Sequence, residues 1–331
     1  MIPNVKQKSN IFSRHIFSRL LAIRELMLMG IILIIWILLS MFVPIFLNPS
    51  NIKAILLGLS TESIVAIGMT IVLVSGGFDL SVGSTLALAG VVTCLCIKAG
   101  IPVFISVIIG ILTGSIIGLI NGYIITKLRI NPFITTLGMM SIVRGFVLIF
   151  ATGATIIDLP KVFTVIGQGK IIGIQLPIII SLVIIIVGDI LLRKSRFFRQ
   201  SYYVGSNEKA ALMTGISVDK VKIFNYVLVG SLAALAGVVT SARFAYASVN
   251  IGIGLELKVI TSCIIGGASL GGGTGSIAGA FLGTLLMATL VNGLNLLGVN
   301  IYWQNVLTGI ILIGAVVFDT VLKEKGKAKS K

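Results

Sequence analysis

Charged residues, acidic ones above all, are scarce in this chain of 331 amino acids. Only 11% of its residues are charged and 56% are hydrophobic, which excludes a soluble domain because such a domain needs a polar surface. Lys and Arg number 26 against 10 Asp and Glu, a net charge of +16. These basic residues flank long apolar runs without interleaved aromatic residues, so they indicate membrane topology and not a nucleic-acid partner. We expect an all-α membrane protein.

Residues that enzymes use for catalysis or metal binding are almost absent. The only histidine, His15, lies in the basic N-terminal segment, and Cys94, Cys96 and Cys263 lie in apolar segments. No catalytic triad, metal-ligand cluster or pair of intramembrane carboxylates at helical spacing is recognisable. The Gly-rich run 271–276 lacks the lysine of a phosphate-binding loop. We expect no catalytic residue, no metal and no cofactor bound by this chain, and no ATP hydrolysis by it.

Apolar segments long enough to cross a bilayer recur about ten times, two of them shortened. The expected spans are 26–47, 52–74, 84–97, 102–126, 132–151, 177–192, 223–245, 257–270, 276–298 and 303–322. The first lacks a small-residue cleavage pattern and is interpreted as a retained helix. The chain thus divides into a basic segment 1–25, one transmembrane domain 26–322 and a basic tail 323–331.

The basic residues orient these spans. With the N-terminus inside, 19 of the 26 Lys and Arg residues fall in cytoplasmic segments, as the positive-inside rule requires. Both termini and the long segment 193–222 are then cytoplasmic. The stretches 152–176 and 248–256 face outside, where they can present a docking surface.

One apolar helix is interrupted at GMTIVLVSGGFDLSVGS, residues 68–84. Gly76 and Gly77 permit a turn, and Asp79 can accept the free N–H groups of the next helix. An irregular backbone in a membrane survives only inside protein or beside a water-filled cavity, so the break indicates a substrate path. An ordinary surface loop with an N-cap aspartate is the alternative.

The same pattern returns 190 residues later. Gly76, Gly77, Leu80 and Gly83 are echoed by Gly266, Gly267, Leu270 and Gly273. In the expected topology both segments run in the same direction, which predicts two related halves arranged as parallel repeats.

Polar groups inside the apolar spans are the candidates for the substrate path. They are Asp79, Ser81, Ser84, Asn121, Asn292 and Asn295, with the turn at Gly76 and Gly77. The alternative for each is a hydrogen bond to a neighbouring helix. Glu62 and Arg144 fall in the middle of spans, where ionisable groups are normally paired or face a cavity. We expect both to face the subunit interior and to pair with each other.

A short helix is predicted within the cytoplasmic segment 193–222. Asn207 is suited to its N-cap, Glu208 to its first turn and Gly215 to its end. Ala210 and Ala211 are small enough to let it enter a groove of a partner. A bland surface helix is the alternative.

Several of these segments together resemble a known family. EKAALMTG (208–215) is similar to the coupling loop of permease subunits of ABC importers. GGFDLSVGS, GLEL (254–257), GGASLGG (266–272) and NGLNLLG (292–298) resemble ribose-type permeases of the branched-chain amino acid and simple-sugar permease superfamily. Phe78, where the family often has isoleucine, and Ser206, where it often has glycine, are small departures.

The resemblance implies a multi-pass inner-membrane permease subunit that is not itself an enzyme. A second permease copy would complete the path, with a homodimer favoured over a heterodimer. An ABC ATPase would bind ATP and Mg inside, and a solute-binding protein would deliver a monosaccharide outside, ribose or a related pentose being favoured and autoinducer-2 or another simple sugar the further options. A self-sufficient secondary transporter or channel is the alternative.

Overall fold

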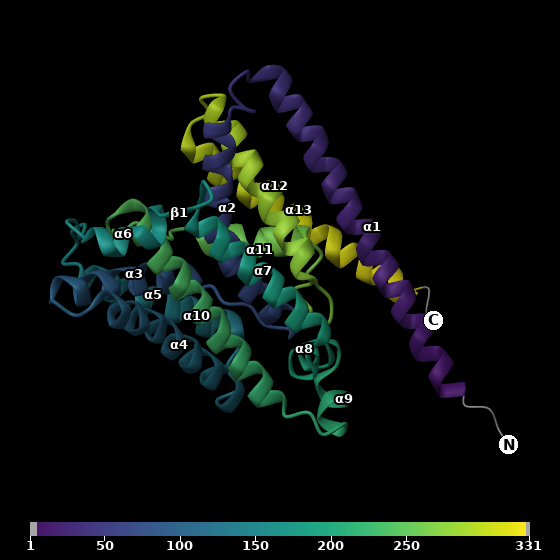
Figure 1. Cartoon of the computed structure of the whole chain (residues 1–331). Coiled ribbons are helices and arrows are strands. Elements are labelled where there is room, and N and C mark those ends of the chain that lie inside the picture. The colour runs from purple at the N-terminus through teal and green to yellow at the C-terminus, as the bar shows by residue number, and fades with distance from the viewer. Residues whose placement is uncertain (1–4, 329–331) are drawn as a thin grey trace.

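The computed structural model describes residues 5–328 and is a bundle of helices (Figure 1). Side chains are described from residue 24 to 321, except at 301 and 318. The helices are α1 (Val5–Phe42), α2 (Pro49–Val74), α3 (Val82–Lys98), α4 (Val103–Lys127), α5 (Pro132–Phe150), α6 (Lys161–Gln168), α7 (Leu176–Lys194), α8 (Arg196–Ser206), α9 (Glu208–Met213), α10 (Val218–Phe244), α11 (Leu255–Ile265), α12 (Ile277–Leu296) and α13 (Ile301–Ala328). One small hairpin joins β1 (Lys170–Ile171) to β2 (Ile174–Gln175).

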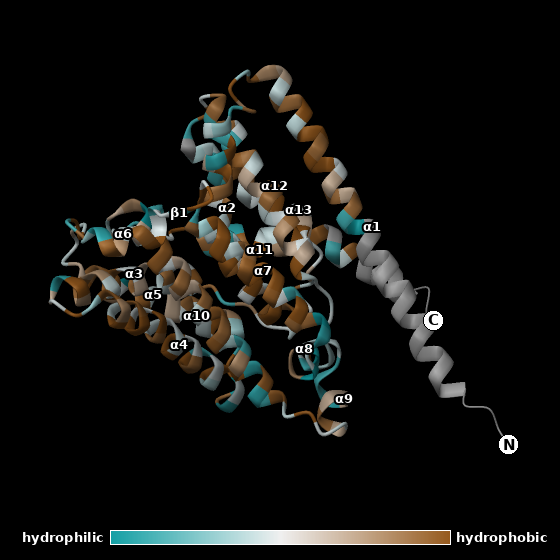
Figure 2. Cartoon of the chain, viewed as in Figure 1, coloured by the Kyte–Doolittle hydropathy of each residue, from teal (hydrophilic) through white to brown (hydrophobic). Residues whose placement is uncertain are grey.

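Ten of these helices coincide with the ten predicted spans. Eight are long and apolar enough to cross a membrane, and Figure 2 colours many of their residues as hydrophobic. The other two, α3 with 17 residues and α11 with 11, are the two predicted short ones. The expectation of an all-α membrane protein that includes short helices is confirmed.

The first span ends earlier than its apolar run predicts. We expected it to continue to residue 47, but α1 ends at Phe42 and residues 44–47 form a turn. Pro44 explains the difference, because the ring of a proline disfavours helical geometry in the residue before it. Hydropathy alone does not register this break.

α10 occupies the centre of the bundle, where small residues allow close helix contacts. Gly230 of α10 and Gly114 of α4 lie back to back, so that a Cβ atom on either would collide with the carbonyl oxygen of the other. Backbone approach of this kind is a common way for membrane helices to associate, because dispersion contacts replace the missing hydrophobic drive. The tight α4–α10 pair gives the other elements a fixed framework.

The two Gly-Gly breaks close in the same way. α2 ends at Val74 and is followed by Gly76 at φ 82°, while α11 ends at Ile265 and is followed by Gly267 at φ 105°. The Gly77 N–H donates to Val72 O at 3.1 Å, and the Ala268 N–H donates to Cys263 O at 2.9 Å. These bonds satisfy carbonyls at the two helix ends. In backbone geometry Gly76 therefore matches Gly267, one residue from the register that the sequence echo indicated.

The outer ends of the first and last helices lie on one side of the bundle. Figure 1 shows the N-terminal end of α1 and the C-terminal end of α13 on the same side as α8 and α9. The turn between α1 and α2 and the hairpin β1–β2 lie towards the other end of the bundle. The side of the membrane that each end of the bundle faces stays a prediction from the basic residues.

Candidate functional site

The two short helices begin side by side inside the bundle. Gly83 in the first turn of α3 lies so close to Gly252 that a Cβ atom on either residue would collide with the carbonyl oxygen of the other. Residues 248–256 were expected in an external loop, but the structure folds this segment back against α3. The backbone therefore reverses direction next to the start of α3, and a contact of this closeness requires glycine on both sides.

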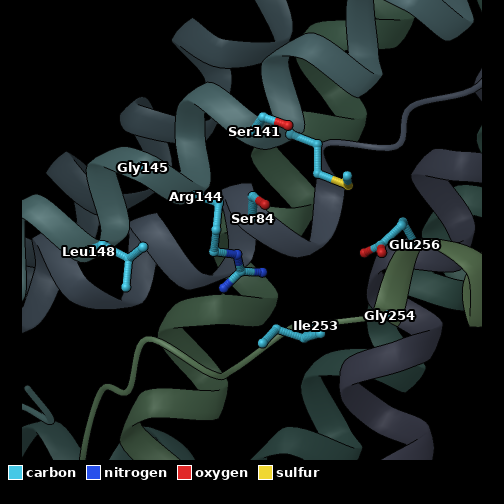
Figure 3. Close-up of a pocket in the computed structure, with 9 residues that line it drawn as sticks. Ser84, Ser141, Arg144, Gly145, Leu148, Ile253, Gly254 and Glu256 are labelled. Atoms are coloured by element: carbon cyan, nitrogen blue, oxygen red, sulfur yellow. The ribbon is translucent and has the colours of Figure 1, made fainter. Parts of the chain in front are cut away.

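A cavity of about 490 Å³ opens at this junction. It is within the range of about 300–1,000 Å³ that is usual for small-molecule sites. Its walls come from α3, from one face of α5 and from the end of the folded-back segment, as Figure 3 shows. The lining residues are Ser84, Met140, Ser141, Arg144, Gly145, Leu148, Ile253, Gly254 and Glu256.

Arg144 holds the folded-back segment in place. Its guanidinium donates hydrogen bonds to the carbonyl oxygens of Val249 at 2.8 Å and of Ile251 at 3.0 Å. Since hydrogen bonds of charged groups contribute about 1.5–3 kcal/mol each, this side chain offsets the cost of bringing an irregular backbone into the bundle. Arg144 thus combines a structural role with a place in the cavity wall.

Donors and acceptors face the cavity from opposite walls. Figure 3 shows the guanidinium of Arg144 and the carboxylate of Glu256 projecting into the same space. The Ser84 hydroxyl lines the same cavity, and within the described residues it has no hydrogen-bond partner although it is buried. A buried polar atom without a partner is costly, and a hydroxylated ligand would satisfy it. The opposite charges of the two walls suit a ligand that is polar and uncharged.

The predicted pairing of Glu62 with Arg144 is wrong. Glu62 in α2 forms an ion pair with Lys258 in α11, whereas Arg144 binds carbonyl oxygens. The sequence places Glu62 and Arg144 in the middle of spans and Lys258 at the start of one, and only the tertiary fold brings Lys258 against α2. Both Glu62 and Arg144 are partly buried in the subunit.

Three of the predicted path residues form one buried cluster. Asp79 Oδ1 accepts hydrogen bonds from the N–H and the hydroxyl of Ser81, at 2.8 and 2.6 Å. The Asn121 amide, from α4, donates to Asp79 Oδ2 at 3.2 Å and to the Ser81 hydroxyl at 3.0 Å. None of the three is more than 1% exposed. Asp79 therefore caps the turn before α3 and ties it to α4, while of these residues and Ser84 only Ser84 reaches the cavity.

The two asparagines of α12 bind neighbouring helices. Asn292 and Asn51 of α2 exchange two side-chain hydrogen bonds, at 2.8 and 3.0 Å. Asn295 accepts a hydrogen bond of 2.6 Å from Gln304 of α13. Both contacts are the alternative considered for these residues in the sequence, and neither asparagine lines the cavity.

Sequence reasoning missed Glu256 and Lys258 as members of the site. Both lie in the first turn of α11, which was expected near the outer surface, where a charge is unremarkable. The available signal was the spacing: two charged residues directly follow a Gly-rich stretch, IGIG at 251–254, and begin an unusually short apolar helix. A short span with charges at its start indicates a helix that begins within the membrane.

The predicted short cytoplasmic helix forms as α9. The Asn207 side chain accepts a hydrogen bond from the Ala210 N–H at 3.0 Å, which is the predicted N-cap. Glu208 forms an ion pair of 2.7 Å with Lys222 of α10. Gly215, at φ 83°, follows the helix end at Met213. Local capping residues thus determine both ends of this helix.

The outward face of α9 differs from the one expected. Ala211, predicted to enter a partner's groove, is 3% exposed and packs on Val204 and Val218 of its own chain. Leu212 and Met213 are instead 54% and 90% exposed. Because a helix turns by about 100° per residue, only one face can be offered to a partner, and here that face carries Leu212 and Met213 beside the exposed Lys209.

α8 connects α9 to both Gly-Gly breaks. Asn207 ends α8 and begins α9 without a linker. A Cβ atom at Gly205 of α8 would collide with Val74 O and lie 2.7 Å from Gly273 N, and the Gly273 N–H donates to Val74 O at 2.8 Å. The Tyr202 hydroxyl donates to Gly275 O at 2.8 Å. The end of α2 and the segment after α11 therefore meet on α8.

Comparison with known proteins agrees with this architecture. The model of the family "Branched-chain amino acid transport system / permease component" matches residues 51–316. The ribose import permease protein RbsC of Bacillus subtilis is 40% identical over 288 residues, which are 86% of this chain and 89% of that protein. The L-arabinose ABC transporter permease protein AraH of Azospirillum brasilense is 37% identical over 298 residues, 90% of this chain and 88% of that protein.

A third relative, the ribose import permease protein RbsC of Escherichia coli K12, is 35% identical over 310 residues, which cover 92% of this chain and 96% of that protein. No solved structure matches the chain. The family model covers most of the chain, and the relatives are similar over nearly their whole length. The chain therefore belongs to the family of permease components of branched-chain amino acid transport systems.

Proposed function

We propose that this chain is the membrane-spanning permease subunit of an ABC importer for a monosaccharide, with ribose or a related pentose as the favoured cargo. Its relatives, ribose and arabinose permeases that are 35–40% identical to this chain, support a pentose. The observation that carries the proposal within the structure is the cavity between α3, α5 and the start of α11, with its unpartnered Ser84 hydroxyl.

The cavity is the proposed contact surface for the sugar. Moving a sugar hydroxyl into a protein interior without a hydrogen bond costs about 1–3 kcal/mol of free energy. Ser84, Ser141, Arg144 and Glu256 supply donors and acceptors along an otherwise apolar wall. A few polar groups of this kind replace some of the hydrogen bonds that the sugar hydroxyls lose with water. They bind the sugar weakly enough to let it leave, which suits transport better than tight binding. Asp79, Ser81 and Asn121 lie behind this wall and support α3.

The partners follow from the same proposal. An ABC ATPase subunit, which would carry ATP and Mg, binds at the exposed apolar face of α9, and α8 transmits its motion to the two Gly-Gly breaks. A solute-binding protein delivers the sugar on the opposite side. A second permease copy, a homodimer being favoured over a heterodimer, closes the cavity on the α5 side. The chain spans the cytoplasmic membrane, and both of its termini are on the cytoplasmic side, where the segments 1–25 and 323–331 form basic flanks.

Reconstituted uptake tests the function. The chain is co-expressed with its ATPase and solute-binding protein, the complex is placed in proteoliposomes, and uptake of labelled ribose, arabinose and glucose is measured with and without ATP. We expect uptake that requires ATP and the binding protein, with a pentose preferred. Uptake by the chain alone, driven by an ion gradient, would contradict the proposal and support a secondary transporter.

A variant in the cavity tests the contact surface separately. Ser84→Ala removes the unpartnered hydroxyl and adds no atoms, and we expect it to lower uptake severalfold without loss of the complex. Ser63→Ala is the control, since the Ser63 hydroxyl of α2 is also buried without a hydrogen-bond partner within the described residues but does not line the cavity. Equal uptake by both variants would remove the cavity from the path and leave the importer assignment standing.

A further inference from the structure

We propose that the junction of α7 and α8 binds the phosphate headgroup of an anionic phospholipid. α7 ends at Lys194 and α8 begins at Arg196. The 19 residues of α7 span about 28 Å at the helical rise of 1.5 Å per residue, close to the thickness of the hydrocarbon core of a bilayer. The junction therefore lies at headgroup level, and Figure 2 shows hydrophilic residues gathering where α7 passes into α8.

The charge at this junction is positive and largely uncompensated. Arg193, Lys194, Arg196 and Arg199 lie within seven residues, and Asp189 is the one acidic residue of α7 and α8. Asp189 is paired with Arg193 at 2.8 Å. Within the described residues the other three cations form no ion pair. A phosphate is the complementary group that a membrane surface supplies at this depth.

Aromatic rings lie beside these cations. Phe197 of α8 and Phe224 of α10 pack edge to face with their centroids 4.8 Å apart, and Phe198 joins them at 5.6 Å from Phe224. Phe197 and Phe224 are each 38% exposed. Aromatic residues and cations on one amphipathic helix suit the boundary between acyl chains and headgroups. This combination favours a lipid over the ATPase, which would meet α9, the element that projects further (Figure 1).

The lipid headgroup would bind where α8 begins, and α8 also contacts both Gly-Gly breaks. A headgroup at Lys194 and Arg196 would anchor this helix against the membrane surface. The inference stands on the junction alone and does not depend on the proposed sugar import.

Native mass spectrometry of the full-length chain in detergent tests the proposal, with dioleoyl phosphatidylglycerol and dioleoyl phosphatidylcholine as probes. The variant is K194Q/R196Q, and the matched control is K209Q/K220Q, which removes two exposed cations from α9 and α10. Because a basic residue at a membrane surface contributes about fivefold in affinity for anionic lipid, we expect K194Q/R196Q to weaken phosphatidylglycerol binding about 30-fold. The control should bind like the parent chain.

Three results would overturn the proposal. They are equal binding of the two lipids by the parent chain, equal loss in both variants, and unchanged phosphatidylglycerol binding in K194Q/R196Q. If the last is accompanied by loss of the co-purified ATPase, the basic surface belongs to the protein partner. Thermal stability in detergent, measured for each variant, distinguishes a lost lipid site from a misfolded chain, and the single variant K194Q, expected to lose about fivefold, serves if the double variant is unstable.

Discussion

Single charged side chains hold the irregular parts of this molecule in place. Arg144 binds two carbonyl oxygens of the folded-back segment, and Lys258 pairs with Glu62 across two helices. Charges inside a membrane protein are expensive and persist where they are paired or serve a function. Here Arg144 is bound to irregular backbone between two helices, and Glu62 is paired with a residue of α11, a helix that begins inside the bundle.

Arg144→Met should abolish most of the transport without dissociating the permease from the ATPase. The change removes hydrogen bonds to Val249 and Ile251, which are worth about 1.5–3 kcal/mol each, so the folded-back segment loses its position in the cavity wall. We expect uptake in the proteoliposome assay to fall at least tenfold, at about equal recovery of the ATPase. Arg144→Lys, which keeps the charge and one donor group, should retain part of the parental uptake.

Lys98→Met is the matched control for Arg144→Met. Lys98 is exposed at the end of α3 and lies 4.0 Å from Asp158, so its loss should leave uptake unchanged. Parental uptake by Arg144→Met would show that the folded-back segment is held by its other contacts.

The cluster of Asp79 and Asn121 should show energetic coupling. Either Asp79→Ala or Asn121→Ala leaves a buried partner unsatisfied, which costs about 1–3 kcal/mol. A double-mutant cycle on unfolding in mixed detergent micelles should therefore give a coupling energy of about 1 kcal/mol. Asp79→Ala combined with Asn292→Ala should be additive, because Asn292 bonds to Asn51 instead. Additive behaviour of the first pair would refute the cluster.

Among the elements, α9 gains its exposed apolar face from the way α8 and α10 support it. Ala211 is enclosed by Val204, Val218 and Val221, and the ion pair between Glu208 and Lys222 fixes the start of the helix. Leu212 and Met213 are left outside. An exposed apolar pair on a short, well-capped helix is typical of a surface that another protein covers.

Met213→Asp should detach or uncouple the ATPase and leave the fold intact. Met213 is 90% exposed, so the folded chain loses almost no packing, while a buried charge in the proposed contact is costly. We expect the amount of co-purified ATPase to fall at least fivefold. Ser217→Asp adds the same charge at an exposed position four residues further on and should be neutral. Parental ATPase recovery and transport in Met213→Asp would rule out α9 as the docking element.

Bulky substitutions at Ala211 and Gly215 should destabilise α9 for different reasons. Ala211→Leu overfills a buried cluster and should lower stability by about 1–3 kcal/mol, whereas Gly215→Leu is strained by the positive φ of that position. Either change should uncouple ATP hydrolysis from transport through α9 itself.

The whole molecule presents two faces whose assignment to the two sides of the membrane is testable. Met213→Cys lies on the side of α8 and α9, and Ile172→Cys is 95% exposed at the tip of the β1–β2 hairpin. In spheroplasts that express the chain without its ATPase, a membrane-impermeant maleimide should label Ile172→Cys before lysis and Met213→Cys only after lysis. The parent chain, with Cys94 and Cys263 buried and Cys96 half-buried, gives the background. The reverse pattern would invert the proposed topology.

The sequence by itself predicted the ten apolar helices of this protein and the short helix α9, but not α6, α8 or the hairpin β1–β2. A helix that crosses a bilayer satisfies its own backbone hydrogen bonds, so its signal is a continuous apolar run, and ten such runs became ten helices. Capping is equally local, which is why Asn207 and Gly215 predicted the limits of α9. Pro44, which ended α1 early, shows where hydropathy without turn chemistry fails.

Only the tertiary structure decided which polar groups meet. Glu62 and its partner Lys258 are separated by 196 positions, and Arg144 and Val249 by 105. No local pattern encodes contacts over such distances, because they depend on the fold-back of residues 248–256 onto α3. The same fold-back moves Glu256 into a cavity wall, and packing between α8, α9 and α10 turns Ala211 inward. The sequence identified the polar residues, and the packing of helices far apart in the chain assigned each of them a partner.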